Sequence, residues 1–181
     1  MSAEDASVPS AEANGPYFNL QVSEVIDETA DSRSIVFEVP AELSERFTYA
    51  SGQFLSFRVE VGGQRLVRCY SLASAPGIDP AHKVTIKRVV DGRASNWMND
   101  EVSAGDQLEV MPPNGVFVLG DRNTPLMLFS GGSGITPCIS IIKTALETTS
   151  RPIKLLYANR DDRSIIFKDE LNAMMSAHSD R

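Results

Sequence analysis

The sequence predicts a two-part fold in which an antiparallel β region is followed by a parallel α/β unit. From Tyr17 to about Leu119, the apolar residues fall in short segments that are rich in β-branched and aromatic side chains and separated by turn signals. Beyond this region the pattern changes to strand, helix, strand and helix. We therefore expect a disordered lead-in over residues 1–16, a β domain over 17–120 and an incomplete α/β domain over 121–181.

The β region contains six candidate strands. Turn signals such as Gly62-Gly63 and Asp91-Gly92 separate them, and six strands at this spacing suggest an antiparallel barrel or a sandwich. One short helix, SNWMNDEV, interrupts the strands, with Ser95 as its expected N-cap. The expected strands are YFNLQVSEVI, SIVFEV, QFLSFRVEV, RLVRCYSL, KVTIKRVV and QLEVM.

The α/β unit begins with PLMLFS, a short apolar run that is typical of a buried parallel strand. The next segment, TPCISIIKTALE, is predicted to be a helix, because Ile139, Ile142 and Leu146 recur on one face. Thr136 can cap this helix, and Pro137 suits its first position. The strand PIKLLYA and the helix-like IIFKDELNAMMSAH follow. Two parallel strands make too little sheet to be stable alone, so we expect a truncated chain or one completed by something else.

A glycine-rich turn, FSGGSGITPC, joins the first strand of this unit to the helix. The N–H groups and the dipole at a helix N-terminus favour an anion there. Gly132 and Gly134 match the first two glycines of the dinucleotide fingerprint, but Pro137 stands where the third would be. The residues alone leave a phosphate site and a structural turn equally open. No Gly-Lys-Ser/Thr follows the glycines, which excludes a P-loop nucleotide hydrolase.

Composition and charge exclude several classes of protein. The chain is 42% hydrophobic and 23% charged, as is ordinary for a globular protein, and no apolar stretch approaches the length of a membrane span. Residues 1–16 lack the pattern of a signal peptide. A net charge of −7 argues against nucleic acid as the main partner. Residues 58–93, however, hold seven Lys/Arg against three acids, which suggests either a local anionic ligand or solvated strand faces.

The two cysteines, Cys69 and Cys138, form no metal-binding spacing. We expect two reduced and mostly buried thiols in a cytoplasmic protein without a membrane partner.

Two further segments carry residues suited to a nucleotide. In RCYS, strand alternation places Arg68 and Tyr70 on one face, where a guanidinium suits phosphate and a ring suits stacking on a flat heterocycle. Ser71 falls on the opposite face unless the strand kinks. The segment DGRAS (91–95) offers a second helix N-terminus for a phosphate. The alternatives are an exposed Arg with a core Tyr for the first segment, and a hairpin turn before a capped helix for the second.

Taken together, six motifs in order resemble the ferredoxin–NADP⁺ reductase superfamily: SGQF, RCYS, TIKRVVDGRAS, PPNGVF, GGSGITP and YANRDDRSIIFKDEL. The similarity runs from about Tyr17 to the last residue, and it looks most like the reductase components of bacterial oxygenases of the steroid- and ring-hydroxylating or phenylacetate type. The resemblance implies an antiparallel FAD-binding β-barrel followed by an NAD(P)-binding α/β domain. It also implies a flavin-dependent oxidoreductase that passes electrons from NAD(P)H through FAD to a redox protein with an iron–sulfur or haem centre.

The resemblance assigns roles to residues of the barrel. Arg68 would neutralise the flavin phosphate, Tyr70 would pack against the isoalloxazine or ribityl chain, and Ser71 would form a hydrogen bond near flavin N5. Tyr70 and Ser71 are therefore the expected catalytic residues. The polar edge of the ring would meet Ile86 and Lys87, largely through backbone groups. The pyrophosphate of FAD, rather than FMN, would be cradled by Gly92, Arg93, Ala94 and Ser95.

In the α/β unit, the resemblance places the nicotinamide nucleotide on the glycine-rich turn and just beyond it. Its expected contacts are Gly131, Gly132, Gly134 and Thr136. Arg160 and Arg163 follow the second strand, where nucleotide domains contact the adenosine ribose. Arginines there suit the 2′-phosphate of NADPH, whereas the intervening Asp161 and Asp162 suit NADH, so the donor stays open.

The sequence departs from full-length relatives in ways that leave other functions open. The Cys-Gly motif of those relatives and their C-terminal residue near the flavin are missing, and no C-x₄-C-x₂-C spacing is present. Any iron–sulfur centre is therefore expected in another segment or a separate protein. The alternatives are a flavin-binding module without turnover and a fragment that binds nothing firmly.

Overall fold

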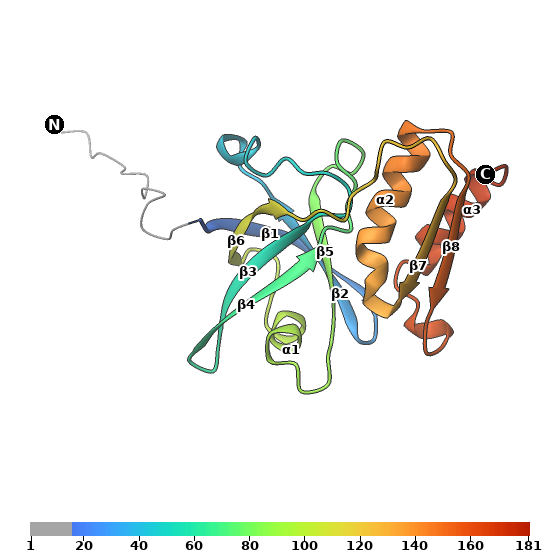
Figure 1. Cartoon of the computed structure of the whole chain (residues 1–181). Coiled ribbons are helices and arrows are strands. Elements are labelled where there is room, and N and C mark those ends of the chain that lie inside the picture. The colour runs from blue at the N-terminus through green and yellow to red at the C-terminus, as the bar shows by residue number, and fades with distance from the viewer. Residues whose placement is uncertain (1–15) are drawn as a thin grey trace.

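The computed structural model describes residues 16–181, and its first part is one six-stranded antiparallel sheet (Figure 1). The lead-in expected over residues 1–16 lies outside the described residues, apart from Pro16. The strand order is β4-β3-β6-β1-β2-β5, and every pairing is antiparallel, as the sequence predicted. The strands are β1 (Phe18–Thr29), β2 (Ser32–Glu38), β3 (Phe54–Val61), β4 (Gln64–Ser71), β5 (His82–Lys87) and β6 (Gln107–Asn114).

The two end strands of this sheet approach each other, so the sheet curls into a barrel. Leu72, directly after β4, forms an antiparallel bridge with Val84 of β5. The N–H of Ala73 donates to the carbonyl of Lys83 at 2.7 Å. These bonds decide between the barrel and the sandwich that the sequence left open. A short 3₁₀ turn, η1 (Ala41–Leu43), lies between β2 and β3.

The interior of the barrel is apolar because alternate residues of each strand point inward. Ile35 and Phe37 of β2 and Phe57 of β3 are fully buried, and the rings of Phe37 and Phe57 lie 5.5 Å apart between centroids. Helix α1 (Arg93–Asp100) covers one end of this core through Ala94 and Met98.

Helix α1 begins two residues earlier than predicted, and Ser95 is not its N-cap. Gly92 precedes the helix, after Asp91 in the left-handed region at φ 57°. The Ser95 hydroxyl lies inside the first turn, where it donates to the carbonyl of Gly92 and accepts from the N–H of Val89. The expected strand KVTIKRVV also ends early, at Lys87, because the backbone turns there to enter the helix.

The α/β unit follows the predicted order, with two parallel strands and two helices. Thr136 does not cap α2, since the helix begins after Gly134 and the Thr136 hydroxyl donates to the carbonyl of Ser133 within the first turn. Ile139 and Ile142 of α2 are buried against the sheet, as their spacing predicted. The elements are β7 (Leu126–Gly131), the 3₁₀ turn η2 (Gly132–Gly134), α2 (Ile135–Thr148), β8 (Ile153–Ala158), the 3₁₀ turn η3 (Asp162–Ser164) and α3 (Lys168–Ala177).

Helix α2 lies between the barrel and the β7–β8 sheet (Figure 1). The Ser140 hydroxyl donates to the carbonyl of Ser74 at 2.6 Å, and both side chains are buried. The Lys143 ammonium lies 3.1 Å from a carboxylate oxygen of Asp79 in the barrel and also pairs with Glu170 of α3. These contacts fix the α/β unit against the barrel.

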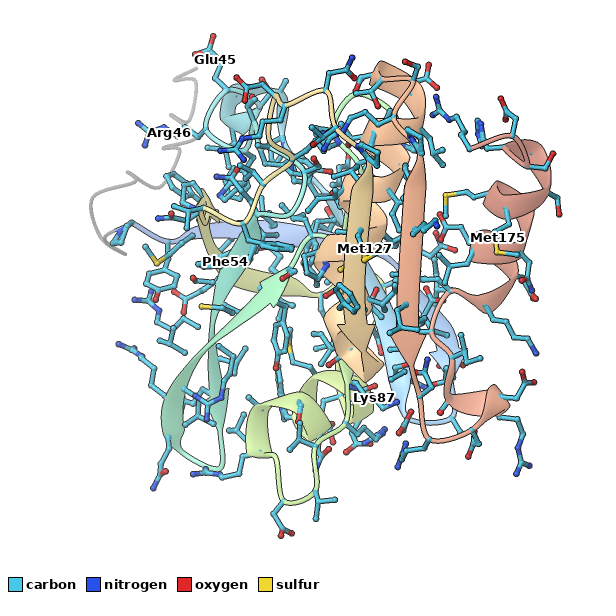
Figure 2. All side chains as sticks on the ribbon, turned by 45° about the vertical axis from the view of Figure 1, so that its right-hand side comes forward. Glu45, Arg46, Phe54, Lys87, Met127 and Met175 are labelled. Atoms are coloured by element: carbon cyan, nitrogen blue, oxygen red, sulfur yellow. The ribbon has the colours of Figure 1, made fainter. Side chains whose placement is uncertain are left out.

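The opposite face of the β7–β8 sheet carries exposed apolar side chains. Met127, Phe129 and Leu156 are 61%, 68% and 65% exposed, and Figure 2 shows Met127 on this sheet. Leu128, which alternates with Met127 and Phe129 along β7, packs against α2 in the second core. The sheet is therefore covered on one face only within the described residues.

Replacing Gly52 by alanine is expected to destabilise the fold. Gly52 has φ +98°, and an added Cβ would lie 2.1 Å from the carbonyl oxygen of Phe117 and 3.0 Å from Cδ1 of Ile141. The backbone clash should lower the free energy of unfolding by about 2–3 kcal/mol. Gly63→Ala is the control, because Gly63 also has positive φ but no atom within 4 Å of an added Cβ. Equal losses in urea unfolding would contradict the role of the close approach.

His82→Gln is expected to remove part of the loss of stability on acidification. Burial lowers the pKa of His82 below its ordinary value of 6.5, despite the hydrogen bond to the carbonyl of Phe47. Below pH 6.5 the unfolded chain therefore binds a proton more readily than the folded one, and stability falls as the pH drops. Urea midpoints measured between pH 7.5 and 5 should fall less for His82→Gln than for the unsubstituted chain. Equal falls in the two proteins would contradict this contribution of His82.

Candidate functional site

A cleft of about 520 Å³ lies between the barrel and the N-terminus of α2. Its volume is in the range of small-molecule and cofactor sites. The barrel supplies the end of β4, the end of β5 and the start of α1, and the α/β unit supplies the glycine-rich turn. The lining residues are Arg68, Cys69, Tyr70, Ser71, Thr85, Lys87, Val89, Gly92, Arg93, Ala94, Ser95, Ser133, Gly134, Thr136 and Pro137.

Most of the predicted site residues meet in this cleft, although they come from four separate segments. The predicted residues that line it are Arg68, Tyr70, Ser71, Lys87, Gly92, Arg93, Ala94, Ser95, Gly134 and Thr136. The structure thus brings together residues whose sequence motifs were each weak alone.

Ser71 reaches the same cleft as Tyr70 even though strand alternation places them on opposite faces. Strand β4 ends at Ser71, and the cleft there is lined by residues of both strand faces, since Cys69 lines it as well. Directly after the strand, Leu72 donates its N–H to the carbonyl of Gln53 at 2.9 Å and bridges to Val84 of β5.

Charge in the cleft favours an anionic ligand. Arg68, Lys87 and Arg93 line it, and no aspartate or glutamate is among the described residues that do so. Arg68 is exposed, and within residues 16–181 no carboxylate lies within ion-pair distance of it. Among these residues its guanidinium donates one hydrogen bond, to the carbonyl of Val67 at 2.7 Å. This cation is therefore available to a phosphate.

Tyr70 offers the cleft a partly buried aromatic ring. Its ring centroid lies 5.8 Å from that of Phe57 in the core, which holds it in place. Burial raises the pKa of Tyr70, against the opposing effect of the Arg68 cation. The phenol is therefore neutral at physiological pH and can donate a hydrogen bond.

The start of α1 presents backbone N–H groups to the cleft. A Cβ at Gly92 would lie 2.5 Å from Oγ of Ser95 and 2.8 Å from Cβ of Val89, so glycine alone fits here. The Arg93 guanidinium instead holds the β3–β4 hairpin, with bonds of 2.5 Å to Oε1 of Gln64 and 2.6 Å to the carbonyl of Val61. Arg93 therefore contributes its backbone N–H to the cleft more than the charge of its guanidinium.

A smaller pocket of about 290 Å³ adjoins the carboxyl ends of β7 and β8. It is lined by Lys87, which also lines the large cleft, and by Gly132, Ala158, Asn159 and Arg160. Gly132 has φ +50°, and no atom lies within 4 Å of an added Cβ there. The predicted residues Gly132 and Arg160 thus lie beside the main cleft, in this second pocket.

The predicted residues Ile86, Gly131 and Arg163 line neither pocket. The Ile86 side chain is buried in the barrel core, and its carbonyl accepts a hydrogen bond from Asn99 at 3.2 Å. Gly131 ends β7 and pairs with Ala158.

Sequence reasoning missed Cys69, Thr85, Val89 and Pro137 as lining residues. Thr85 shares a strand face with Lys87, so alternation along β5 was a usable signal. The prediction that both thiols are mostly buried was wrong for Cys69, which is exposed, while Cys138 is buried. Cys69 alternates with Tyr70, whose ring packs against Phe57 of the core, so the Cys69 side chain lies on the opposite face of β4.

The donor set fits a flavin nucleotide. The cleft combines an aromatic ring with three groups suited to phosphate. These are the Arg68 guanidinium, which has no ion-pair partner within residues 16–181, the N-terminus of α1, and Gly92, whose lack of a side chain lets a phosphate approach the backbone closely. Among residues 16–181, no group of His, Cys, Asp and Glu side chains is arranged to hold a metal ion, and no helix there is long and apolar enough to cross a membrane.

Known proteins resemble this chain in sequence and in fold. The curated ferredoxin reductase component of 3-ketosteroid-9-alpha-monooxygenase from Rhodococcus rhodochrous is 50% identical over 163 residues, which are 90% of this chain and 46% of that protein. The flavohem-like FAD/NAD-binding domain of nitric oxide dioxygenase from Vibrio cholerae has a TM-score of 0.80 at 27% identity, covering 89% of this chain and 70% of that one. Phthalate dioxygenase reductase has a TM-score of 0.73 at 28% identity, covering 89% and 49%.

These matches confirm the predicted fold class, a β-barrel followed by a parallel α/β unit. The chain spans about half the length of the curated relatives that it matches, 46% of the first and 47% of the next. The family model described as "Oxidoreductase FAD-binding domain" matches residues 19–119, and "Oxidoreductase NAD-binding domain" matches residues 128–181. The chain therefore belongs to the FAD-binding oxidoreductase family and carries an NAD-binding oxidoreductase segment after the FAD-binding domain.

Proposed function

We propose that this chain is the flavin-dependent reductase part of an oxygenase system, taking electrons from NAD(P)H and passing them through FAD to an iron–sulfur or haem protein. The observation that carries the proposal is the shared cleft, in which phosphate-binding groups of the barrel and the glycine-rich turn of the α/β unit line one cavity. The names of relatives support it, since one is a monooxygenase reductase component and another a glycine betaine monooxygenase reductase subunit.

The barrel residues are proposed to hold FAD. The Arg68 guanidinium and the N–H groups from Gly92 to Ser95 bind phosphate oxygens, and the Tyr70 ring packs against the flat flavin. The Ser71 hydroxyl, beside Tyr70 in the cleft, orients the reacting edge by a hydrogen bond. FAD held there supplies the acceptance of a hydride and its release as single electrons, chemistry that no side chain of this protein has.

The α/β unit is proposed to bring the nicotinamide nucleotide to the same cleft. Gly134 and Thr136 at the start of α2 line the cavity that Tyr70 and Ser71 line. A donor bound to these residues is thereby held next to the flavin site and away from bulk water. Gly131, Gly132 and Arg160, beyond the cleft, hold the remainder of the nucleotide.

We place the division between the FAD-binding and NAD-binding domains at residue 120, with the domains over 17–120 and 121–181. The first sheet ends at Asn114 and the second begins at Leu126, so this division falls between them. We place the protein in the cytoplasm, since Cys69 and Cys138 are both free thiols.

A flavin-binding module without turnover is the second candidate. Within the described residues, the exposed side chains of Met127, Phe129 and Leu156 on the β7–β8 sheet favour it, because apolar side chains left in water add nothing to the stability of that sheet. Both candidates require bound flavin, so reduction by the nucleotide separates them.

Addition of NADH, and then of NADPH, to the purified protein under argon is expected to bleach its visible flavin absorbance. Loss of the absorbance with either nucleotide demonstrates hydride transfer and names the donor. A flavin spectrum that only dithionite bleaches would leave the module without turnover. A colourless protein that takes up no added FAD would contradict the assignment of Arg68, Tyr70 and Ser71.

Arg68→Ala is expected to weaken FAD binding by about tenfold or more, because one charge-assisted contact to phosphate is lost. Titration of the flavin-free protein with FAD, followed by flavin fluorescence, measures the change. Arg65→Ala is the matched control, since Arg65 is exposed on the same strand but does not line the cleft. An equal weakening by both substitutions would show that strand charge in general, and not Arg68, binds the phosphate.

A further inference from the structure

Asp31 is a carboxylate of the barrel that lies against a cation of the α/β unit. It sits in the turn between β1 and β2, and its Oδ2 accepts a hydrogen bond of 2.5 Å from Nη2 of Arg160. Its Oδ1 lies 3.4 Å from Nζ of Lys87 and accepts a 2.9 Å hydrogen bond from Thr29. One carboxylate thus faces both cations of the smaller pocket.

That pocket lies where a parallel α/β unit binds its nucleotide. Gly132 and Ala158 mark the carboxyl ends of β7 and β8, the edge at which ligands of such sheets bind. Both side-chain polar atoms of Asn159 are buried there without a hydrogen-bond partner. An arginine beside such a site accommodates the 2′-phosphate of the phosphorylated dinucleotide, whereas a carboxylate suits a free ribose hydroxyl. The state of Arg160 therefore bears on which nucleotide binds.

Asp31 is charged at physiological pH. Burial alone would raise its pKa, but the hydrogen bonds from Thr29 and Arg160 and the charge of Lys87 outweigh burial and hold the pKa below its ordinary value. The carboxylate side chain is 28% exposed and the Arg160 side chain 71%, so an incoming nucleotide can reach the pair. A phosphate that approaches Arg160 must displace Asp31 or stay beside its negative charge.

We propose that Asp31 is a specificity-determining residue that makes this chain favour the nucleotide without a 2′-phosphate, because it occupies the guanidinium of Arg160. A ribose hydroxyl has no charge to be repelled, so it binds beside Asp31 without breaking the ion pair. This inference rests on the proposed function, in which the smaller pocket holds part of the nucleotide donor.

Calorimetric titration of the 181-residue chain with two nucleotide fragments tests the proposal. The probes are adenosine 5′-monophosphate and adenosine 2′,5′-bisphosphate. Asp31→Asn, which keeps the side-chain shape, is expected to tighten binding of the bisphosphate about tenfold and to change that of the monophosphate less than about twofold. The double variant Asp31→Asn/Arg160→Gln should lose this gain, because the freed guanidinium is then absent.

Asp27→Asn is the matched control. Asp27 lies on the same hairpin and pairs with an arginine, Arg33, at 2.6 Å, but it does not contact Arg160. This variant removes the same charge and should leave the ratio of the two affinities unchanged. The flavin absorbance of each variant checks that the barrel is intact.

Three results would overturn the proposal. An unchanged affinity ratio in Asp31→Asn, or the same rise in Asp27→Asn, would show that Asp31 does not select the nucleotide. Tighter binding of the bisphosphate than of the monophosphate by the unsubstituted chain would also overturn the proposal. If neither fragment binds to any variant while flavin is retained, the nucleotide site of the proposed function fails along with the role of Asp31.

Discussion

The packing of α2 against the barrel is the contact on which the candidate site depends. The buried bond from Ser140 to the Ser74 carbonyl and the ion pair of Lys143 with Asp79 join the two parts across this contact. Gly52 permits a backbone approach here that a Cβ would block. Because α2 begins directly after the glycine-rich turn, fixing the helix also fixes the turn. The cleft has two walls only because this helix is held in one place.

Tertiary structure divides the basic residues of the β region into separate roles. Residues 58–93 carry an excess of positive charge, which suggested an anionic ligand or solvated faces. Arg58 pairs with Glu109, and Arg88 pairs with Asp100 at 2.6 Å, so both have structural partners. Arg68 lines the cleft and has no carboxylate partner in the part of the chain that the structure describes. Both interpretations of the excess positive charge therefore hold, each for different residues. Arginines with an ion-pair partner have a structural role, whereas Arg68 can bind an anionic ligand.

Local patterns predicted much of this fold, but they failed for the two helix caps and for the burial of Cys69. Alternation and helical spacing identified all six strands of the barrel and the βαβα order, since burial of one face imposes those periods. The caps Ser95 and Thr136 were wrong because a cap depends on which N–H groups the turn leaves free, and glycine preceded each helix. Cys69 is exposed because it alternates with Tyr70, and only the tertiary structure shows that Tyr70 is the one that packs toward the core.

The sequence by itself determined the order of elements, the family motifs and most of the residues that line the cleft, because each of these is written in short segments. Only the tertiary structure decided that Ser71 lines the same cleft as Tyr70, that Ile86 faces the core and that Arg160 lies in a separate pocket. It also joined Asp31 to Arg160, which are 129 residues apart. Such a pairing leaves no periodic pattern in the sequence, because it depends on how two units that are distant in sequence pack against each other.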